Sequence, residues 1–249
     1  YPLALMAGVA AGIINTLAGS GSLLTLPVLL FLGLPPNVAN GTNRVGVVMQ
    51  NLVSVTTLHR AGRLQLTGAL RLTVVATAGS IVGALIAVDL DRQTMNTAIG
   101  ILMVVMLLVI LFDPQRWLRP HSELKSERHS IGALALFFVI GVYAGFIQAG
   151  VGIFLLAAMV MGLGYSLVEA NCIKLLLILV TTAVALLVFA GNSQVEWGIG
   201  GLMALGQGTG AWLAARFALS RKDAAIWVRR LLIAVVILSI LKQFGLLPL

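Results

Sequence analysis

Residues 15–27 read NTLAGSGSLLTLP, an uncharged stretch in which Gly and Ser interrupt an apolar region that runs from Leu3 to Leu32. This region is about 30 residues long, and as one helix it would measure roughly 45 Å, which exceeds the hydrocarbon thickness of a bilayer. A second region of similar length, Ile131 to Leu163, is interrupted at Gly150-Val151-Gly152. Because both regions are too long for one simple crossing, we expect each to break at its glycines.

The rest of the chain predicts an all-α polytopic membrane protein. Its 249 residues are 59% hydrophobic and 10% charged, and the apolar stretches recur through its whole length. Long apolar runs such as Ile99 to Phe112 differ from the short alternating segments of a β-barrel. We therefore expect a multi-pass membrane protein, with further spans at Val38–Leu58, Leu66–Val88, Thr94–Phe112, Leu167–Ala190, Trp197–Leu219 and Ala224–Phe244.

Composition and motifs argue against several function classes. One cysteine, Cys172, and three histidines provide neither an internal disulfide nor metal-ligand spacing, so we expect no metal and no cofactor. The net charge of +8 comes from basic residues in short loops, where it sets membrane orientation and attracts lipid, so no nucleic-acid partner is expected. The spans carry no nucleophile and base at reacting spacing, and the chain has no P-loop, so we expect no enzyme.

The two halves of the chain resemble each other. GVAAGIIN (8–15) aligns with GVYAGFIQ (141–148), ANGTNRV (39–45) with ANCIKLL (170–176), and GSIVGA (79–84) with GQGTGA (206–211). The matches keep their order, which indicates an internal duplication. We predict one membrane domain with a first repeat at 1–112, a cytoplasmic linker at 113–130 and a second repeat at 131–249.

The distribution of basic residues favours one topology. If each broken region crossed the membrane once, the basic residues would divide almost evenly between the two sides. If each is a re-entrant hairpin that leaves on the side it entered, only Arg92 and Lys242 lie opposite the rest, Arg44 and Lys174 being inside spans. This asymmetry is typical of cytoplasmic loops. We therefore predict two inverted-topology repeats, each a glycine-broken re-entrant hairpin plus three transmembrane helices.

Hairpin tips near the midplane indicate a substrate site. Backbone that is not helical is tolerated at membrane depth only where protein or a water-filled cavity surrounds it. Inverted repeats with broken helices are typical of secondary transporters, which bind substrate at the repeat interface. The alternative is that these glycines only allow close helix packing.

The residues also carry a family resemblance. The patterns GxxAGxxNTLAGSGSxLxLP, LGLPPxxANGTNRV and HRAGRL in the first half, with GxxAGFxxAGVG and EANCIK in the second, resemble the TauE/SafE sulfite exporter family, also called the 4-toluenesulfonate uptake permease family. The likeness covers both halves. It implies transport of sulfite, organosulfonates or related small sulfur-containing anions across the cytoplasmic membrane.

Such an anion needs hydrogen-bond donors and positive potential. We expect Arg44 and Lys174, two cations inside spans, to attract it. The alternatives are that Lys174 snorkels or pairs with Glu169, and that Arg44 reaches the head groups. Polar side chains near these cations would orient the anion, and the glycine breaks would supply backbone N–H groups and hydroxyls. The full predicted site is Asn15, Gly19, Ser20, Gly21, Ser22, Asn40, Asn43, Arg44, Gln148, Gly150, Gly152, Asn171 and Lys174.

The sequence therefore predicts a secondary transporter for small sulfur-containing anions. Two alternatives stay open: a channel, because broken hairpins also build pores, and a carrier for carboxylates or amino-acid anions, because the same donors bind carboxylates. The partners expected are a small anion and membrane lipid. A coupling proton or ion and a homo-oligomer also stay open.

Overall fold

The computed structural model describes residues 2–18, 21–62, 64, 69–111, 130–217 and 237, and their regular structure is helical. The all-α class is therefore confirmed. Gly19, Ser20, the predicted linker apart from Ser130, and the predicted span 224–244 apart from Ile237 lie outside the described residues. The elements are α1 (Pro2–Ala18), α2 (Ser22–Phe31), α3 (Pro36–Arg60), α4 (Ala69–Asp89), α5 (Arg92–Leu111), α6 (Ile131–Phe146), α7 (Val151–Ala157), the π-helical η3 (Ala158–Gly162), α8 (Leu167–Gly191) and α9 (Trp197–Phe217).

Local signals set several helix starts. α3 begins with Pro36 at its first position, where a missing N–H costs little. α8 begins after Ser166, whose hydroxyl accepts from the backbone N–H of Glu169, while the Glu169 carboxylate accepts from the backbone N–H of Ser166. At the start of α5, the Thr94 hydroxyl donates to the Asp91 carboxylate over 2.6 Å, and this bond lowers the pKa of Asp91 below its usual value.

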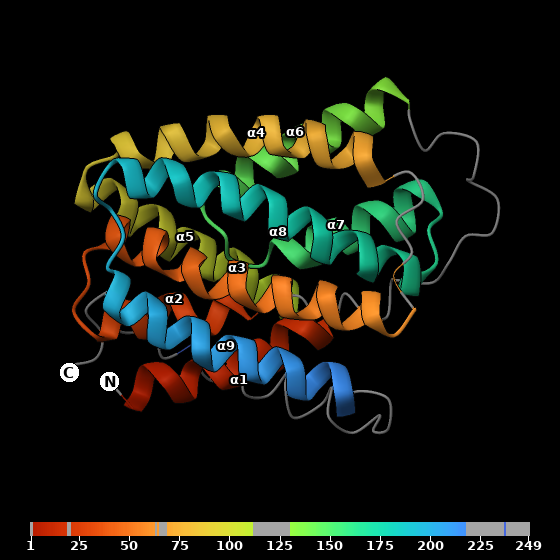
Figure 1. The fold of residues 1–249 in the computed structure, drawn as a ribbon. Helices are drawn as coiled ribbons and strands as arrows, with labels where there is room; N and C mark the ends of the chain where they lie inside the picture. Colours follow the sequence, from red (N-terminus) through yellow and green to blue (C-terminus); the bar gives the residue numbers. More distant parts are fainter. Residues whose placement is uncertain are drawn as a thin grey trace.

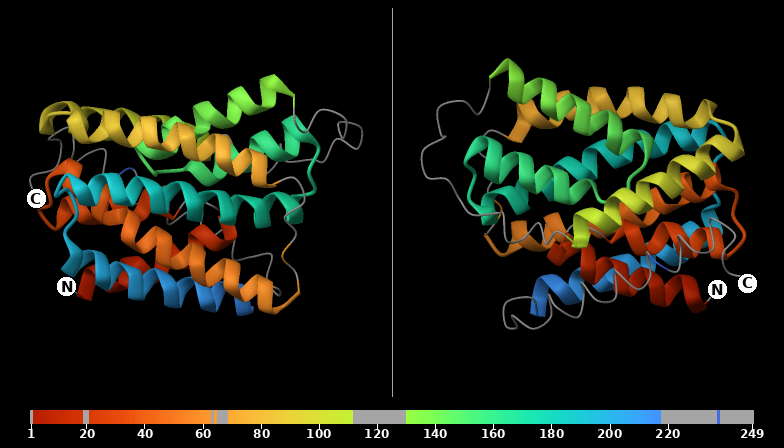
Figure 2. Two further views of the ribbon diagram at one scale, coloured as in Figure 1. Left: turned by 45° about the horizontal axis from the view of Figure 1, so that its top comes forward. Right: turned by 180° about the vertical axis from the view of Figure 1, so that it is seen from behind.

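The helices form one elongated bundle. α3, α4, α5, α8 and α9 run between its two ends (Figure 1). α1 and α2 extend into the bundle from the end at which α3 begins, whereas α6 and α7 extend from the opposite end (Figure 2). The two interrupted regions of the sequence therefore begin at opposite ends of the bundle.

Two seams of glycine hold the bundle together. α1 packs on α9 and α4 packs on α6, and every helix in these pairs presents glycines four residues apart. A Cβ added at Gly12 would overlap the backbone oxygen of Gln207, and one at Gly83 would overlap that of Val142. Small residues at this spacing let helix backbones approach closely in a membrane. The α1–α9 seam contains Gly8, Gly12, Gly206 and Gly210, and the α4–α6 seam contains Gly79, Gly83, Gly141 and Gly145.

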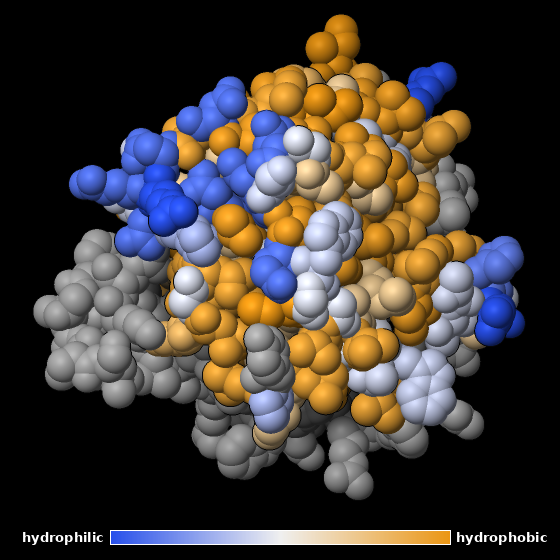
Figure 3. Space-filling view, turned by 60° about the vertical axis from the view of Figure 1, so that its left-hand side comes forward, coloured by the Kyte–Doolittle hydropathy of each residue, from blue (hydrophilic) through white to orange (hydrophobic). Residues whose placement is uncertain are grey.

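Hydropathy separates the lipid-facing helices from α3. Within the described part of the chain, α4, α5 and α8 are the helices long and apolar enough to cross a membrane by length and composition. Their outward side chains include Val74 and Leu187, which are 60% and 72% exposed. Figure 3 shows apolar side chains over much of one face, with hydrophilic ones gathered in patches. α3 has the length of a span, at 25 residues, but its many polar side chains are buried inside the bundle.

Candidate functional site

Polar side chains gather in the interior of the bundle, mainly along α3. Burying a polar group away from water costs free energy unless it finds a partner, and in a membrane protein such groups are functional candidates. The buried polar residues of α3 are Asn37, Asn40, Thr42, Asn43, Arg44, Gln50, Asn51 and Ser54.

The first chain break lies between α1 and α2. Gly21 sits against Ala11 and Asn15 of α1, so the chain at Gly21 lies back alongside α1. The backbone N–H of Gly21 donates to the Asn15 side-chain oxygen over 3.3 Å. Ser22, the first residue of α2, is buried. The structure therefore brings Asn15, Gly21 and Ser22 together at this break.

A hydrogen bond ties α2 to α3. The Thr25 hydroxyl donates to the side-chain oxygen of Asn43 over 2.5 Å, and both residues are buried. Asn43, one of the predicted site residues, thus lies beside the first turn of α2. Thr25 was not predicted, because its place opposite Asn43 follows from the packing of α2 on α3 and not from its spacing in the sequence.

The second break lies between Phe146 and Val151. Gly150 has a φ of +73°, a left-handed conformation that glycine adopts readily, and an added Cβ there would overlap the Met106 sulfur. The Tyr143 hydroxyl donates to the backbone oxygen of Ala149 over 2.5 Å, which ties α6 to the segment before α7. Gly152 lies buried in the first turn of α7.

Arg44 binds the end of α6. Its Nη1 donates to the backbone oxygen of Ala144 and to the Gln148 side-chain oxygen, each over 3.1 Å, and its Nη2 donates to the backbone oxygen of Gly145 over 2.5 Å. Its guanidinium carbon lies 4.6 Å from the centre of the Phe189 ring. Carbonyls at a helix C-terminus carry partial negative charge, which a cation complements. The guanidinium therefore satisfies backbone groups that the break in α6 leaves open.

Two neutral side chains complete these contacts. Asn40 donates to the backbone oxygen of Phe146 over 2.7 Å, and Thr182 of α8 donates to the Gln148 side-chain oxygen over 3.0 Å. The structure thus brings Asn40, Arg44 and Gln148 together, around the second break. Because Arg44 is 0% exposed, it does not reach the head groups.

Lys174 lies in a different part of the bundle. Its side chain is 0% exposed, so it does not snorkel, and its ammonium donates to the Asn171 side-chain oxygen over 2.7 Å. Phe189, which stacks on Arg44, is fifteen positions after Lys174 in α8, or about 22 Å along a helix. Arg44 and Lys174 therefore contact α8 at different levels along its length.

The described residues contain no group of three or more His, Cys, Asp or Glu side chains that could hold a metal ion. The chemistry that this interior can offer is hydrogen bonding from amides, hydroxyls and two buried cations.

Residues 4–243 match the model of the family described as sulfite exporter TauE/SafE. The chain belongs to the TauE/SafE family. Three curated relatives cover most of it. It is 28% identical over 212 residues to the "Probable membrane transporter protein ORF9" of Sinorhizobium sp, covering 85% of this chain and 80% of that protein.

Two further relatives of this TauE/SafE-family chain carry similar names. The "Probable membrane transporter protein" of Haemophilus influenzae is 26% identical over 219 residues, covering 88% of this chain and 85% of the relative. The "Probable membrane transporter protein YfcA" of Escherichia coli K12 is 28% identical over 219 residues, covering 87% of this chain and 80% of the relative. No solved structure gives a significant match. The family and the apolar helices identify a multi-pass membrane protein, and the relatives are named as transporters and not as enzymes.

Several buried polar atoms have no hydrogen-bond partner. A buried unpaired group in a native protein requires an explanation, and contact with a ligand or water supplies one. In the described part of the chain these atoms are Asn37 Oδ1, Asn40 Oδ1, Asn43 Nδ2, Arg44 Nε, Gln50 Oε1, Asn51 Oδ1, Gln194 Oε1 and Gln207 Nε2.

Sequence reasoning missed two polar residues of the interior, Gln207 of α9 and Ser54 of α3. Gln207 of α9 lies against Gly46, where an added Cβ would overlap its Nε2, and Ser54 lies 3.5 Å from the Thr16 hydroxyl of α1. Both could have been found from the sequence, because each is a polar side chain inside a predicted span. The α3 positions 40, 43, 47, 50 and 54 also recur at helical spacing.

Proposed function

We propose that this TauE/SafE-family protein is a secondary transporter for small sulfur-containing anions: sulfite, a sulfonate or a similar organosulfur anion. The anion binds near the midplane, between the two chain breaks. The observation that carries the proposal is the line of buried polar side chains on α3, several with unpaired atoms, where a membrane protein would otherwise place apolar ones. The description of the family as a sulfite exporter supports the sulfur chemistry.

The proposal includes two repeats of inverted topology, residues 1–112 and 131–249, each with a re-entrant hairpin and three membrane helices. Two observations support it. The α1–α2 and α6–α7 pairs extend into the bundle from opposite ends. The glycine seams are also reciprocal, because α1 of the first half packs on α9 of the second and α6 of the second half packs on α4 of the first. Secondary transporters with this construction place their substrate at the repeat interface.

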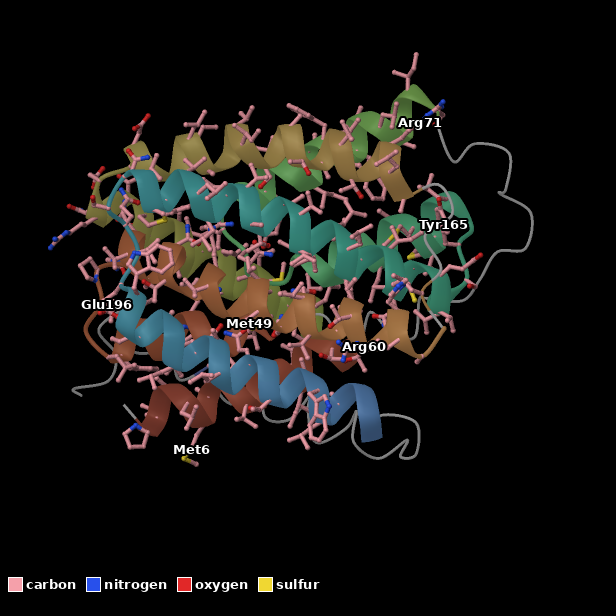
Figure 4. The ribbon with its side chains drawn as sticks, in the orientation of Figure 1. Met6, Met49, Arg60, Arg71, Tyr165 and Glu196 are labelled. Carbon is pink, nitrogen blue, oxygen red and sulfur yellow. The ribbon has the colours of Figure 1, made fainter. Side chains whose placement is uncertain are left out.

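The end of the bundle at which α6 begins is proposed to face the cytoplasm. Arg60 and Arg71 lie toward this end and Glu196 toward the other (Figure 4), and basic residues favour the cytoplasmic side. Single cysteines at Ser126 and Ser193 test this in intact cells with a membrane-impermeant thiol reagent. We expect labelling at position 193 alone, and the parent protein with its buried Cys172 is the control. Labelling at 126 alone would reverse the orientation, and labelling at both would contradict the inverted repeat.

We divide the proposed site residues into three groups according to their contacts. Asn15, Gly21 and Ser22, with Gly19 and Ser20, serve the first break, where the N-terminus of α2 offers N–H donors and Asn43 lies close by. Asn40, Arg44 and Gln148, with Gly150 and Gly152, shape the second break. Asn171 and Lys174 lie in α8. An ammonium has three N–H donors, and in the described part of the chain Lys174 uses one of them, on Asn171. Both buried cations would raise the electrostatic potential of the interior, which attracts an anion.

A thermal-stability screen of the detergent-purified protein tests the function. The panel contains sulfite, thiosulfate, taurine, sulfoacetate, toluenesulfonate, sulfate, acetate and glutamate. A ligand at about 100 times its Kd should stabilise the protein by about 2.7 kcal/mol. We expect stabilisation by a sulfur anion, and we expect Lys174→Ala to weaken its binding roughly tenfold or more through loss of a charge-assisted donor.

Arg71→Ala is the matched control, because Arg71 is an exposed cation and its loss should leave affinity unchanged. The same ligand should then exchange across liposomes in a saturable way. Stabilisation and exchange by carboxylates alone would move the function to another solute, and single-channel currents would favour a pore. Absence of both binding and exchange would contradict the proposal.

A further inference from the structure

Three amide side chains surround Gly46 in the middle of the bundle. Asn43 and Gln50 lie three residues before and four residues after Gly46 on α3, which places them on the same face of the helix. Gln207 of α9 meets this face at Gly46, where the absent Cβ makes room for its Nε2. Asn43, Gln50 and Gln207 are only 1%, 2% and 1% exposed. We call these three residues the amide cluster.

Each member of the amide cluster has an atom without a partner. Within the described residues, the Nδ2 of Asn43 and the Nε2 of Gln207 are unpaired donors, and the Oε1 of Gln50 is an unpaired acceptor. The orientation of Asn43 follows from Thr25, whose hydroxyl donates to its oxygen and leaves the amide nitrogen open. Buried polar groups are normally paired, so a cluster with two open donors and one open acceptor indicates a ligand.

The amide cluster lies beside the first break. Thr25, which donates to Asn43, lies in the first turns of α2. The N-cap residue of α2 is Gly21, so no N-cap side chain accepts from the first N–H groups of this helix. Free N–H groups at a helix start favour anions. The polar groups at the second break differ from the amide cluster because they bind the end of α6. Asn40 and Arg44 donate to backbone oxygens there, and Arg44 also donates to the Gln148 side chain.

We propose that the amide cluster selects an anion that itself carries a hydrogen-bond donor, such as a hydroxy- or amino-substituted sulfonate or hydrogensulfite. This inference rests on the proposed transport of sulfur anions and names the substrate class within it. Asn43 and Gln207 donate to the anionic oxygens, and Gln50 accepts from the O–H or N–H group. With the Gln50 amide oriented as in the structure, an anion with acceptor atoms alone would leave the Gln50 oxygen buried and unpaired, which costs affinity. Sites that bind a substrate hydroxyl reject analogues that lack it for the same reason.

Isethionate and propanesulfonate test this selection because they have similar size and charge and differ by a hydroxyl in place of a methyl group. Affinity is measured by calorimetry on the purified full chain, with liposome exchange as a second readout. We expect isethionate to bind roughly tenfold more tightly than propanesulfonate. Gln50→Leu should reduce this preference to about twofold or less while propanesulfonate binds as before or better. Gln194→Leu is the matched control, because Gln194 also has an unpaired oxygen but bonds Val88 at the end of the bundle, and it should keep the preference.

A second pair of variants tests the cluster without removing an amide. Gly46→Ala adds a methyl group where the Gln207 amide lies, and it should weaken both sulfonates about tenfold. Gly201→Ala, at a position of α9 with nothing near the added Cβ, should leave both affinities unchanged. Equal binding of isethionate and propanesulfonate to the unchanged protein would overturn this inference and leave the proposed function standing. Absence of sulfur-anion binding and exchange would overturn the proposed function and this inference with it.

Discussion

Replacing Arg44 by alanine is expected to destabilise the protein by about 3 kcal/mol or more, since it takes a charged donor away from three buried acceptors. The backbone oxygens of Ala144 and Gly145 and the side chain of Gln148 would each lose a hydrogen bond. Thermal unfolding followed by size-exclusion chromatography in detergent measures the change. Transport should fall with the loss of folded protein, because the end of α6 would no longer be held to α3.

Two further variants separate the roles of Arg44. Arg44→Lys keeps the charge but not the forked geometry, and it should lie between alanine and arginine in stability. Arg60→Ala, at the exposed end of α3, is the control and should change stability by less than about 0.5 kcal/mol. If Arg44→Ala lost anion affinity but kept the unfolding temperature of the unchanged protein, Arg44 would be a ligand for the anion and not a support for α6.

Adding a side chain in either glycine seam is the second change with a large expected effect. Gly83→Val in the α4–α6 seam and Gly210→Val in the α1–α9 seam would drive Cβ atoms into backbone oxygens of Val142 and Val9. Backbone cannot yield as a flexible side chain can, so we expect a cost of about 3 kcal/mol or more. The measurement is the yield of monodisperse protein from membranes.

Gly201→Val provides the comparison for this prediction, because nothing lies near an added Cβ at that position of α9. It should accumulate like the unchanged protein. The reciprocal packing also predicts that the two seam variants fail to a similar degree. Normal accumulation of Gly83→Val would show that α4 and α6 do not approach as closely as the structure places them.

Much of the fold could be predicted from composition and spacing. Hydropathy predicted α4, α5 and α8 to within a few residues, because long apolar runs bury their backbone groups only as helices in a bilayer. The interruption near Gly150 was also predictable, since an apolar region longer than the bilayer must break and glycine accepts the left-handed conformation seen there. α3 was predicted as a span, but its low hydropathy makes sense only in the tertiary structure, where other helices surround its polar side chains.

The candidate site was less predictable. The sequence grouped Asn40, Asn43 and Arg44 in one predicted site, yet it could not separate the faces of α3 that they occupy. Asn43 meets α2, whereas Asn40 and Arg44 meet the end of α6. Gln207 was missed because its role depends on its contact with Gly46. The two residues are far apart in the sequence and meet only through the packing of α9 on α3.

The sequence by itself determined the helical class, the family likeness and the places where glycine interrupts an apolar region, because hydropathy and backbone freedom are properties of short stretches. The tertiary structure alone decided what the buried polar groups contact. Arg44 binds a carbonyl 100 positions away, and about 22 Å of helix separates its stacking partner Phe189 from Lys174. Which donors are satisfied and which stay open for a ligand depends on such distant contacts, because a hydrogen bond forms only where folding brings both partners within about 3 Å.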